Sequence, residues 1–240
     1  ARYCCAMRTA GAAPVGVDRL AVTAGGVNAL MLTVQALVNA GDRVVVVTPV
    51  WPNLTAQPAI MGAEVHCVSL RPVDGQWQLD MAALLAAITP ATKLLVLNAP
   101  NNPTGSIYSS ETIKALFDLS RTRGIALVID ETYKDFRDGN APSHPIFSID
   151  GWEDAFIHLY SFSKAFAMTG YRVGAITAST RVLAEIEKIM DCMAICTSHI
   201  SQRAALFALT RLDDWKRAKI AMMHGRLTSL RDAFRREGLK

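Results

Sequence analysis

Short runs of aliphatic and β-branched residues alternate along the chain with longer stretches of mixed polarity. The short runs predict strands at residues 19–23, 44–47, 64–68, 94–97, 125–129, 155–160 and 173–177. The longer stretches predict helices at residues 27–39, 54–61, 81–88, 110–124, 180–193, 198–210 and 213–237. The run 44–47 lacks polar alternation, as expected when both faces of a parallel sheet are covered. The pattern predicts an α/β fold, with three αβα layers around a mostly parallel central sheet.

Polar and small residues mark the ends of several predicted helices. Asp80 precedes one helix, and Ser109 or Ser110 precedes another, where a side-chain oxygen can accept a backbone N–H. Gly41 and Gly124 follow predicted helices, at positions where a left-handed backbone is common. These residues predict where the elements begin and end.

Composition narrows the class of protein. The 240 residues are 51% hydrophobic, enough for a sizeable core in one large or two small domains. The net charge of +4 is spread out, so nucleic acid is not an expected partner. No run of about 18 apolar residues occurs, so no membrane span is expected.

The cysteines do not form the spacing of a disulfide framework, which favours a reducing, cytoplasmic location. They are Cys4, Cys5, Cys67, Cys192 and Cys196. Cys192, Cys196 and His199 are spaced to share one face of a helix. We expect this face to be a buried apolar stripe and not a metal site, because free cysteine behaves as a small hydrophobe.

A single lysine, Lys164, follows the predicted strand at residues 155–160. We expect its amine to be partly desolvated, which favours the uncharged form that attacks carbonyl groups. The hydroxyls of Ser161 and Ser163 and the guanidinium of Arg172 would suit a phosphate beside this amine. A lysine in an ordinary surface loop is the alternative.

Two further clusters follow predicted strands, at the edge where open parallel sheets bind ligands. Gly25, Gly26 and Val27 lie between a strand and a helix, so their backbone N–H groups can approach an anion. Trp51 lies between two prolines and could stack on a flat ligand. An ordinary tight turn and a core tryptophan are the respective alternatives.

Polar residues also follow the strands at 94–97 and 125–129. Asn102 lies in a turn-forming Asn-Pro-Thr-Gly stretch and offers an amide if the turn is functional. Asp130 ends an apolar run, with Tyr133 three residues later. A carboxylate there needs a cationic or N–H partner, unless it caps the next helix.

Taken in order, these motifs resemble those of the class I and II pyridoxal-phosphate aminotransferases, which have fold type I. The resemblance extends over essentially the whole chain. It is carried by Asn102-Pro103-Thr104-Gly105, Asp130-Glu131-Thr132-Tyr133, Ser161-Phe162-Ser163-Lys164 and Arg172.

The resemblance implies a role for each site residue. Lys164 would bind pyridoxal 5′-phosphate covalently and then act as general acid and base. Asp130 would pair with the pyridine nitrogen, Tyr133 and Asn102 would contact the phenolic oxygen, and Trp51 would stack on the ring. The residues implied to hold the phosphate are Gly25, Gly26, Val27, Ser161, Ser163 and Arg172. The family also implies cis peptides at Thr48-Pro49 and Asn102-Pro103.

The resemblance further implies a cytoplasmic homodimeric transaminase that moves an amino group between an amino acid and a 2-oxo acid by a ping-pong mechanism. A carbon–sulfur β-lyase, an enzyme like aminocyclopropane-carboxylate synthase, and the effector domain of a transcription regulator are the alternatives. Residues 1–210 would form the large cofactor-binding domain. Residues 211–240 would begin a long helix leading to a small domain outside this chain. We therefore expect the chain to be part of a longer protein.

Overall fold

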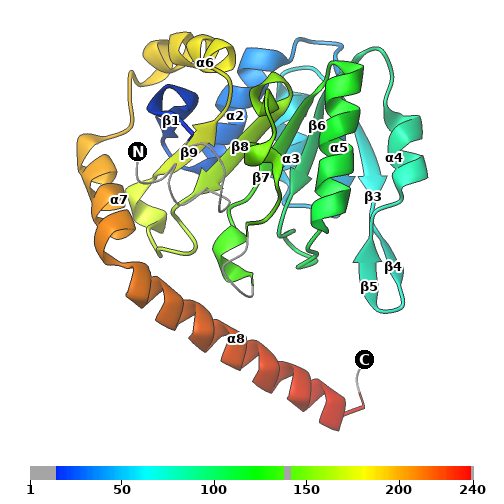
Figure 1. Cartoon of the computed structure of the whole chain (residues 1–240), viewed down its shortest axis with the longest axis vertical. Helices are drawn as coiled ribbons and strands as arrows, with labels where there is room; N and C mark the ends of the chain where they lie inside the picture. The colour runs from blue at the N-terminus through cyan, green and yellow to red at the C-terminus, as the bar shows by residue number, and fades with distance from the viewer. Residues whose placement is uncertain (1–14, 138–141, 239–240) are drawn as a thin grey trace.

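The computed structural model describes residues 15–137 and 142–238, and it confirms the predicted three-layer α/β fold (Figure 1). A seven-stranded sheet forms the middle layer. Its strands are β1 (Leu20–Thr23), β2 (Arg43–Thr48), β3 (Glu64–Ser69), β6 (Thr92–Asn98), β7 (Ala126–Asp130), β8 (Phe156–Ser161) and β9 (Gly174–Thr177). A separate two-stranded hairpin is formed by β4 (Arg71–Val73) and β5 (Gln76–Gln78).

The sheet is mostly parallel. Its strand order is β1-β9-β8-β7-β6-β2-β3, and β9 pairs antiparallel with both of its neighbours. The remaining neighbours, from β8 across to β3, pair in parallel. Strand β1 therefore points in the same direction as β8, and β9 alone in this sheet points the other way.

Seven α-helices are described, each close to its predicted bounds. They are α2 (Gly26–Leu37), α3 (Asn53–Ile60), α4 (Met81–Ala87), α5 (Ser110–Arg123), α6 (Thr180–Met193), α7 (His199–Arg211) and α8 (Asp213–Arg236). The expected caps are present, since Asp80 accepts the N–H of Ala83 and Ser109 accepts that of Thr112. Gly124 ends α5 in the left-handed conformation, with φ 63°.

Alternate side chains of the sheet enter two separate cores. Val45 and Val47 of β2 belong to the core that α4, α5 and α7 cover, whereas Val44 and Val46 belong to the core under α2, α3 and α6. All four valines are buried. Burial on both faces explains why β2 reads as an uninterrupted apolar run.

Two features at the edge of the body depart from the expectations. The exposed hairpin of β4 and β5 was not predicted. Helix α6 ends at Met193 and α7 begins at His199, so Cys192, Cys196 and His199 do not share one helix. All three are exposed, and the predicted buried stripe is wrong. No group of residues suited to a metal ion occurs in the described part of the chain.

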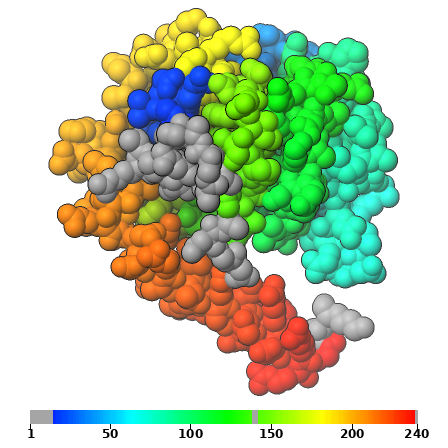
Figure 2. Space-filling model, viewed as in Figure 1, coloured from blue at the N-terminus to red at the C-terminus, as the bar shows by residue number. Residues whose placement is uncertain are grey.

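Helix α8 projects from the body as a separate arm (Figure 2). It has 24 residues, and none is buried. Within residues 15–137 and 142–238, no helix is long and apolar enough to cross a membrane.

Candidate functional site

The topology brings the predicted site residues to one edge of the sheet. The carboxyl ends of β1, β2, β6, β7 and β8 all lie there. Gly25, Trp51 and Asn102 follow β1, β2 and β6, whereas Asp130 and Ser161 are the last residues of β7 and β8. Because β9 runs in the opposite direction, its amino end reaches the same edge and carries Arg172. The clusters therefore lie at one edge of the sheet, where residues at the carboxyl ends of parallel strands come together.

Gly25 and Gly26 form a cradle with Arg172 and Ser161. Gly25 has φ 91°, and a Cβ atom there would lie 2.4 Å from Arg172 Nη2. A Cβ atom at Gly26 would lie 3.0 Å from Ser161 Cβ. The cradle thus combines the amino end of α2, a guanidinium and a hydroxyl, a donor set that suits a phosphate.

Arg172 is held in place by the loop between β8 and β9. Its Nη1 donates to the carbonyl oxygen of Thr169 at 3.0 Å and lies 3.5 Å from Ser163 Oγ. The backbone N–H of Ser163 donates to Ser161 Oγ at 3.3 Å. The two predicted hydroxyls and the guanidinium therefore share one small region, as a common anionic ligand requires.

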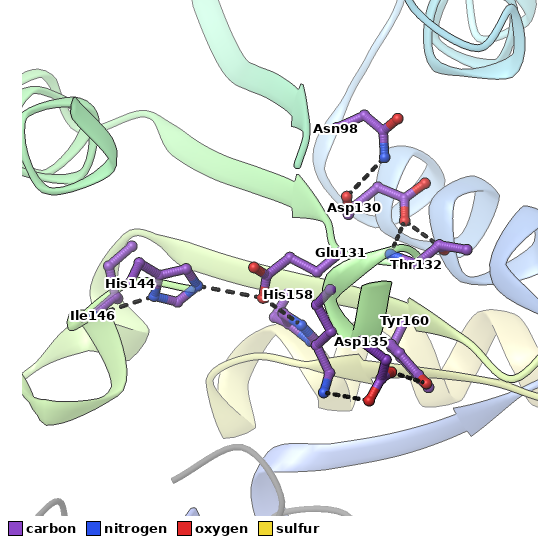
Figure 3. A network of polar contacts seen from close by, with 10 residues as sticks. Asn98, Asp130, Glu131, Thr132, Asp135, His144, Ile146, His158 and Tyr160 are labelled. Atoms are coloured by element: carbon purple, nitrogen blue, oxygen red, sulfur yellow. Dashed lines mark hydrogen bonds and ion pairs between the residues drawn. The ribbon is translucent and has the colours of Figure 1, made fainter. Parts of the chain in front are cut away.

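Asp130 ends β7 as a half-buried carboxylate. Its Oδ1 accepts the backbone N–H of Thr132 at 3.0 Å and the Thr132 hydroxyl at 2.7 Å (Figure 3). Desolvation raises the pKa of Asp130, and the bonds from Thr132 oppose that rise. The carboxylate forms a local turn and does not cap the next helix, whose preceding residue is Tyr133. Thr132 was not predicted as a site residue.

Asn98 is a second site residue that the sequence motifs did not indicate. It ends β6, is buried, and pairs in register with Asp130. Its Nδ2 donates to the Asp130 carbonyl oxygen at 2.9 Å (Figure 3). Its Oδ1 accepts the N–H of Asn102 at 2.6 Å. Asn98 therefore fixes two site loops to each other. A polar residue closing an apolar run was the signal that could have identified it.

The remaining predicted residues lie at the same edge with different exposures. Lys164 Nζ is 6.0 Å from the centroid of the Tyr133 ring, but the Lys164 side chain is exposed, so the expected desolvation is wrong for this chain. Trp51 is half-buried against the core under α2, in partial agreement with a core tryptophan. Val27 is exposed, and Asn102 is half-buried. The expected cis peptides are present, together with a third at Ala99-Pro100.

Directly behind Asp130, Glu131 is buried beside two histidines. Glu131 Oε2 lies 2.9 Å from His158 Nε2 and 3.4 Å from His144 Nε2 (Figure 3). The N–H of Ile146 donates to His144 Nδ1, so the Nε2 of a neutral His144 carries the hydrogen that faces Glu131. Despite desolvation, the two histidines hold the pKa of Glu131 well below its ordinary value. Desolvation lowers the pKa of His158.

Comparison with known proteins shows the same family over almost the whole chain. The family model described as aminotransferase class I and II matches residues 6–240. The aspartate aminotransferase of Musicola paradisiaca is 35% identical over 78% of this chain and 47% of its own length. The aspartate/prephenate aminotransferase of Thermus thermophilus is 34% identical over 90% of this chain and 53% of its own length.

A solved structure shows the same architecture. The crystal structure of the Thermotoga maritima aspartate aminotransferase matches with a TM-score of 0.85 and 28% identity. The match covers 93% of this chain and 58% of that one. The chain spans about half the length of the curated relatives it matches.

Proposed function

The chain belongs to the class I and II aminotransferase family, and on this premise we propose that it is the cofactor-binding part of a pyridoxal-phosphate-dependent transaminase. The observation that carries the proposal is the meeting of the Gly25, Ser161 and Arg172 cradle with Asp130 and Lys164 at one sheet edge. One edge thus offers a phosphate cradle, a carboxylate and an amine. The proposed reaction moves an amino group from an amino acid to a 2-oxo acid.

The phosphate group is proposed to lie in the cradle, against Ser161, Ser163, Arg172 and the backbone N–H groups of Gly26 and Val27. A Cβ atom at Gly25 would lie 2.4 Å from Arg172 Nη2 and one at Gly26 would lie 3.0 Å from Ser161 Cβ, so a larger residue at either position would push these side chains away. The positive amino end of α2 and the guanidinium would together offset most of the charge of a phosphate dianion.

Asp130 is proposed to face the pyridine nitrogen and to hold a proton there. Thr132 keeps this carboxylate oriented through two hydrogen bonds, and Asn98 fixes the backbone behind it. Tyr133 and Asn102 would contact the phenolic oxygen, and Trp51 would pack on the ring face. When bound, pyridoxal phosphate supplies an electron-accepting ring that stabilises negative charge on the substrate carbon.

Lys164 is proposed to bind the cofactor covalently through Nζ. The Lys164 amine would also serve as the general base and acid that takes a proton from the substrate α-carbon and later gives it back. Exposure of Lys164 at the sheet edge leaves its amine accessible to both cofactor and substrate.

We also propose how this chain fits into a larger assembly. Residues 1–210 would form the cofactor-binding domain, and residues 211–240 would begin the helix that leads to a further domain. Exposed apolar side chains on α7, such as Ile200 and Phe207, support a homodimer, which light scattering can test. Free cysteines among the described residues are compatible with a cytoplasmic protein.

The covalent attachment can be tested directly. The protein is incubated with pyridoxal phosphate, reduced with borohydride and digested, and mass spectrometry locates the modified lysine. We expect modification at Lys164, loss of the near-visible absorbance in Lys164→Ala, and no change in the exposed control Lys188→Ala. Attachment at any other lysine would contradict the assignment.

The reaction type needs a second measurement. A panel of amino acids and 2-oxo acids is supplied, and both products are quantified. Formation of a new amino acid together with a new 2-oxo acid supports the transaminase. Release of ammonia and pyruvate without amino transfer would indicate a β-lyase instead.

A further inference from the structure

One side chain near the start of α8 reaches back to the body of the molecule. Lys216 Nζ donates to Asp135 Oδ1 at 2.9 Å, and the Lys216 side chain is only 17% exposed. Most of α8 lies far more open, with no buried residue in the helix. The side chain of Lys216 therefore points toward the body of the molecule and makes a specific contact, unlike a lysine on a solvated helix face.

The carboxylate that Lys216 contacts belongs to the loop with Asp130 and Tyr133. Asp135 lies two residues after Tyr133, and its Oδ2 accepts the hydroxyl of Tyr160 at 2.6 Å (Figure 3). Tyr160 is buried in β8, directly before Ser161 of the phosphate cradle. Lys134 Nζ, 3.8 Å away, is a second cation beside Asp135. Although desolvation opposes them, these partners lower the pKa of Asp135.

The same ammonium group contacts the loop that carries Lys164. Lys216 Nζ lies 5.1 Å from the centroid of the Phe166 ring, two residues after Lys164. One charge on α8 therefore meets the loops after β7 and after β8. The separation of these loops sets the separation of the Tyr133 ring and the Lys164 amine.

A second contact fixes the orientation of α8. His224 Nε2 lies 2.9 Å from the carbonyl oxygen of Phe136, the residue after Asp135. Two contacts about two turns apart on α8 determine a direction as well as a position. The loop that follows Asp130 is thus braced by the helix along its outer side.

We propose that Lys216 and Asp135 are positioning residues for the transamination site. Lys216 holds the Asp135 carboxylate and the Phe166 ring together, and through them sets the distance between Tyr133 and Lys164. The position of α8 therefore controls the geometry around the cofactor amine. This inference rests on the proposed function, because it concerns the same lysine.

The test compares variants of Lys216 with a matched change on the same helix. Lys216→Met keeps most of the side-chain volume but removes the charge, and Lys219→Met is the control because Lys219 is exposed. A misplacement of about 1 Å can lower a rate by on the order of a hundredfold. We expect Lys216→Met to slow covalent attachment of pyridoxal phosphate by about tenfold, since the ring contacts partly remain.

A spectroscopic measurement separates positioning from general stability. The near-visible absorbance of the bound cofactor is titrated with pH, and its midpoint reports the surroundings of Lys164. We expect Lys216→Met and Asp135→Asn to shift this midpoint in the same direction, Lys216→Arg to restore it, and Lys219→Met to leave it unchanged. The double variant should shift no further than the larger single shift, because both changes break one contact.

Each outcome decides between the claims. If the wild-type protein does not attach the cofactor at Lys164, the proposed function fails, and this inference with it. If attachment is normal but Lys216→Met matches Lys219→Met in rate and midpoint, the positioning role alone is wrong. Should Lys216→Met not fold, Asp135→Asn and Lys216→Arg supply the same two readouts, and unchanged values in Asp135→Asn would overturn the proposal.

Discussion

The central sheet and α8 are stabilised in different ways. The sheet lies between two cores, and strands such as β2 bury alternate side chains in each. Helix α8 has 24 residues, none of them buried, and it exposes Leu227, Leu230 and Phe234. Apolar burial holds the sheet, whereas a few polar contacts near Lys216 and His224 hold the helix.

This difference indicates where the proposed site gets its rigidity. The phosphate cradle and Asp130 sit on elements with a complete core beneath them, so we expect their shape to persist without help from α8. The loops around Tyr133 and Lys164 depend on both parts. The site is therefore built from a rigid half and a half that responds to the position of α8.

The largest expected change in the free energy of unfolding distinguishes the buried core from helix α8. Phe117 of α5 is fully buried, so Phe117→Ala should lower the free energy of unfolding by about 4 kcal/mol. Phe234→Ala on α8 removes a ring that is 48% exposed and should have a much smaller effect. Chemical denaturation measures both. Similar losses in the two variants would show that the arm is packed as tightly as the body.

The next effect concerns the buried charge behind Asp130. Glu131→Gln removes the carboxylate that faces His144 and His158, and should destabilise the fold by about 3 kcal/mol. Glu153→Gln is the control, because Glu153 lies at the periphery in a partly exposed pair with Arg19. Equal losses in both variants would mean that burial of Glu131 has no special role.

The same residues predict how stability depends on pH. The pKa values of His158 and Glu131 are both lowered in the folded protein, so the unfolded chain binds more protons. The free energy of unfolding should therefore fall as the pH drops below 6.5, and again below 4.5, the ordinary values for the two groups. Denaturation midpoints against pH measure this. In Glu131→Gln the second decline should be weaker.

A smaller free-energy change is expected for ligand binding at the phosphate cradle. Gly25→Ala forces a Cβ onto a residue with φ 91°, 2.4 Å from Arg172 Nη2. The Cβ would displace the Arg172 guanidinium from the cradle. Loss of its charge-assisted hydrogen bond costs about 2 kcal/mol, which should weaken pyridoxal phosphate binding by roughly thirtyfold. Gly170→Ala is the matched control, because a Cβ there meets open space. Titration calorimetry compares the two, and equal affinities would argue against a cradle at Gly25.

The smallest expected change in the free energy of unfolding concerns the amino ends of two helices. Ser109 caps α5 through the N–H of Thr112, whereas no side chain caps the start of α8. Ser109→Ala should lower the free energy of unfolding by about 1 kcal/mol. Ser110→Ala, one residue later, should have little effect. If the two serines behaved alike in thermal denaturation, the cap would contribute nothing measurable.

Much of the fold was predictable because a strand that is buried on both faces of a sheet appears in the sequence as an uninterrupted run of apolar residues. The valines of β2 and the aliphatic residues of β6 and β7 form short uninterrupted apolar runs, which is the pattern of strands buried between two cores. The meeting of the site clusters followed from one rule, that parallel strands present their carboxyl ends at the same edge. The exposed β4 and β5 hairpin was missed because it contributes no buried residues.

The parts that were missed depend on register and on surroundings. Asn98 becomes important only because it pairs with Asp130, and Glu131 only because His144 and His158 fold against it. Exposure of Lys164 depends on which elements pack over it, which a motif does not specify. The cysteine stripe failed because Ile195, with φ 62°, interrupts the helix between Cys192 and Cys196.

The Gly25 turn of the phosphate cradle also packs closely against Gly174, the first residue of β9. A Cβ at Gly174 would lie 2.6 Å from the Gly25 carbonyl carbon, although the two residues lie at opposite ends of the sheet-forming sequence. Such a contact joins residues far apart in the sequence, so it cannot form until both have been synthesised. During synthesis, the chain emerges from its amino end, so the glycine turn at Gly25 is made before β9 and Arg172 are available to pack against it. Capture of an anion in this cradle would therefore report that the sheet is complete.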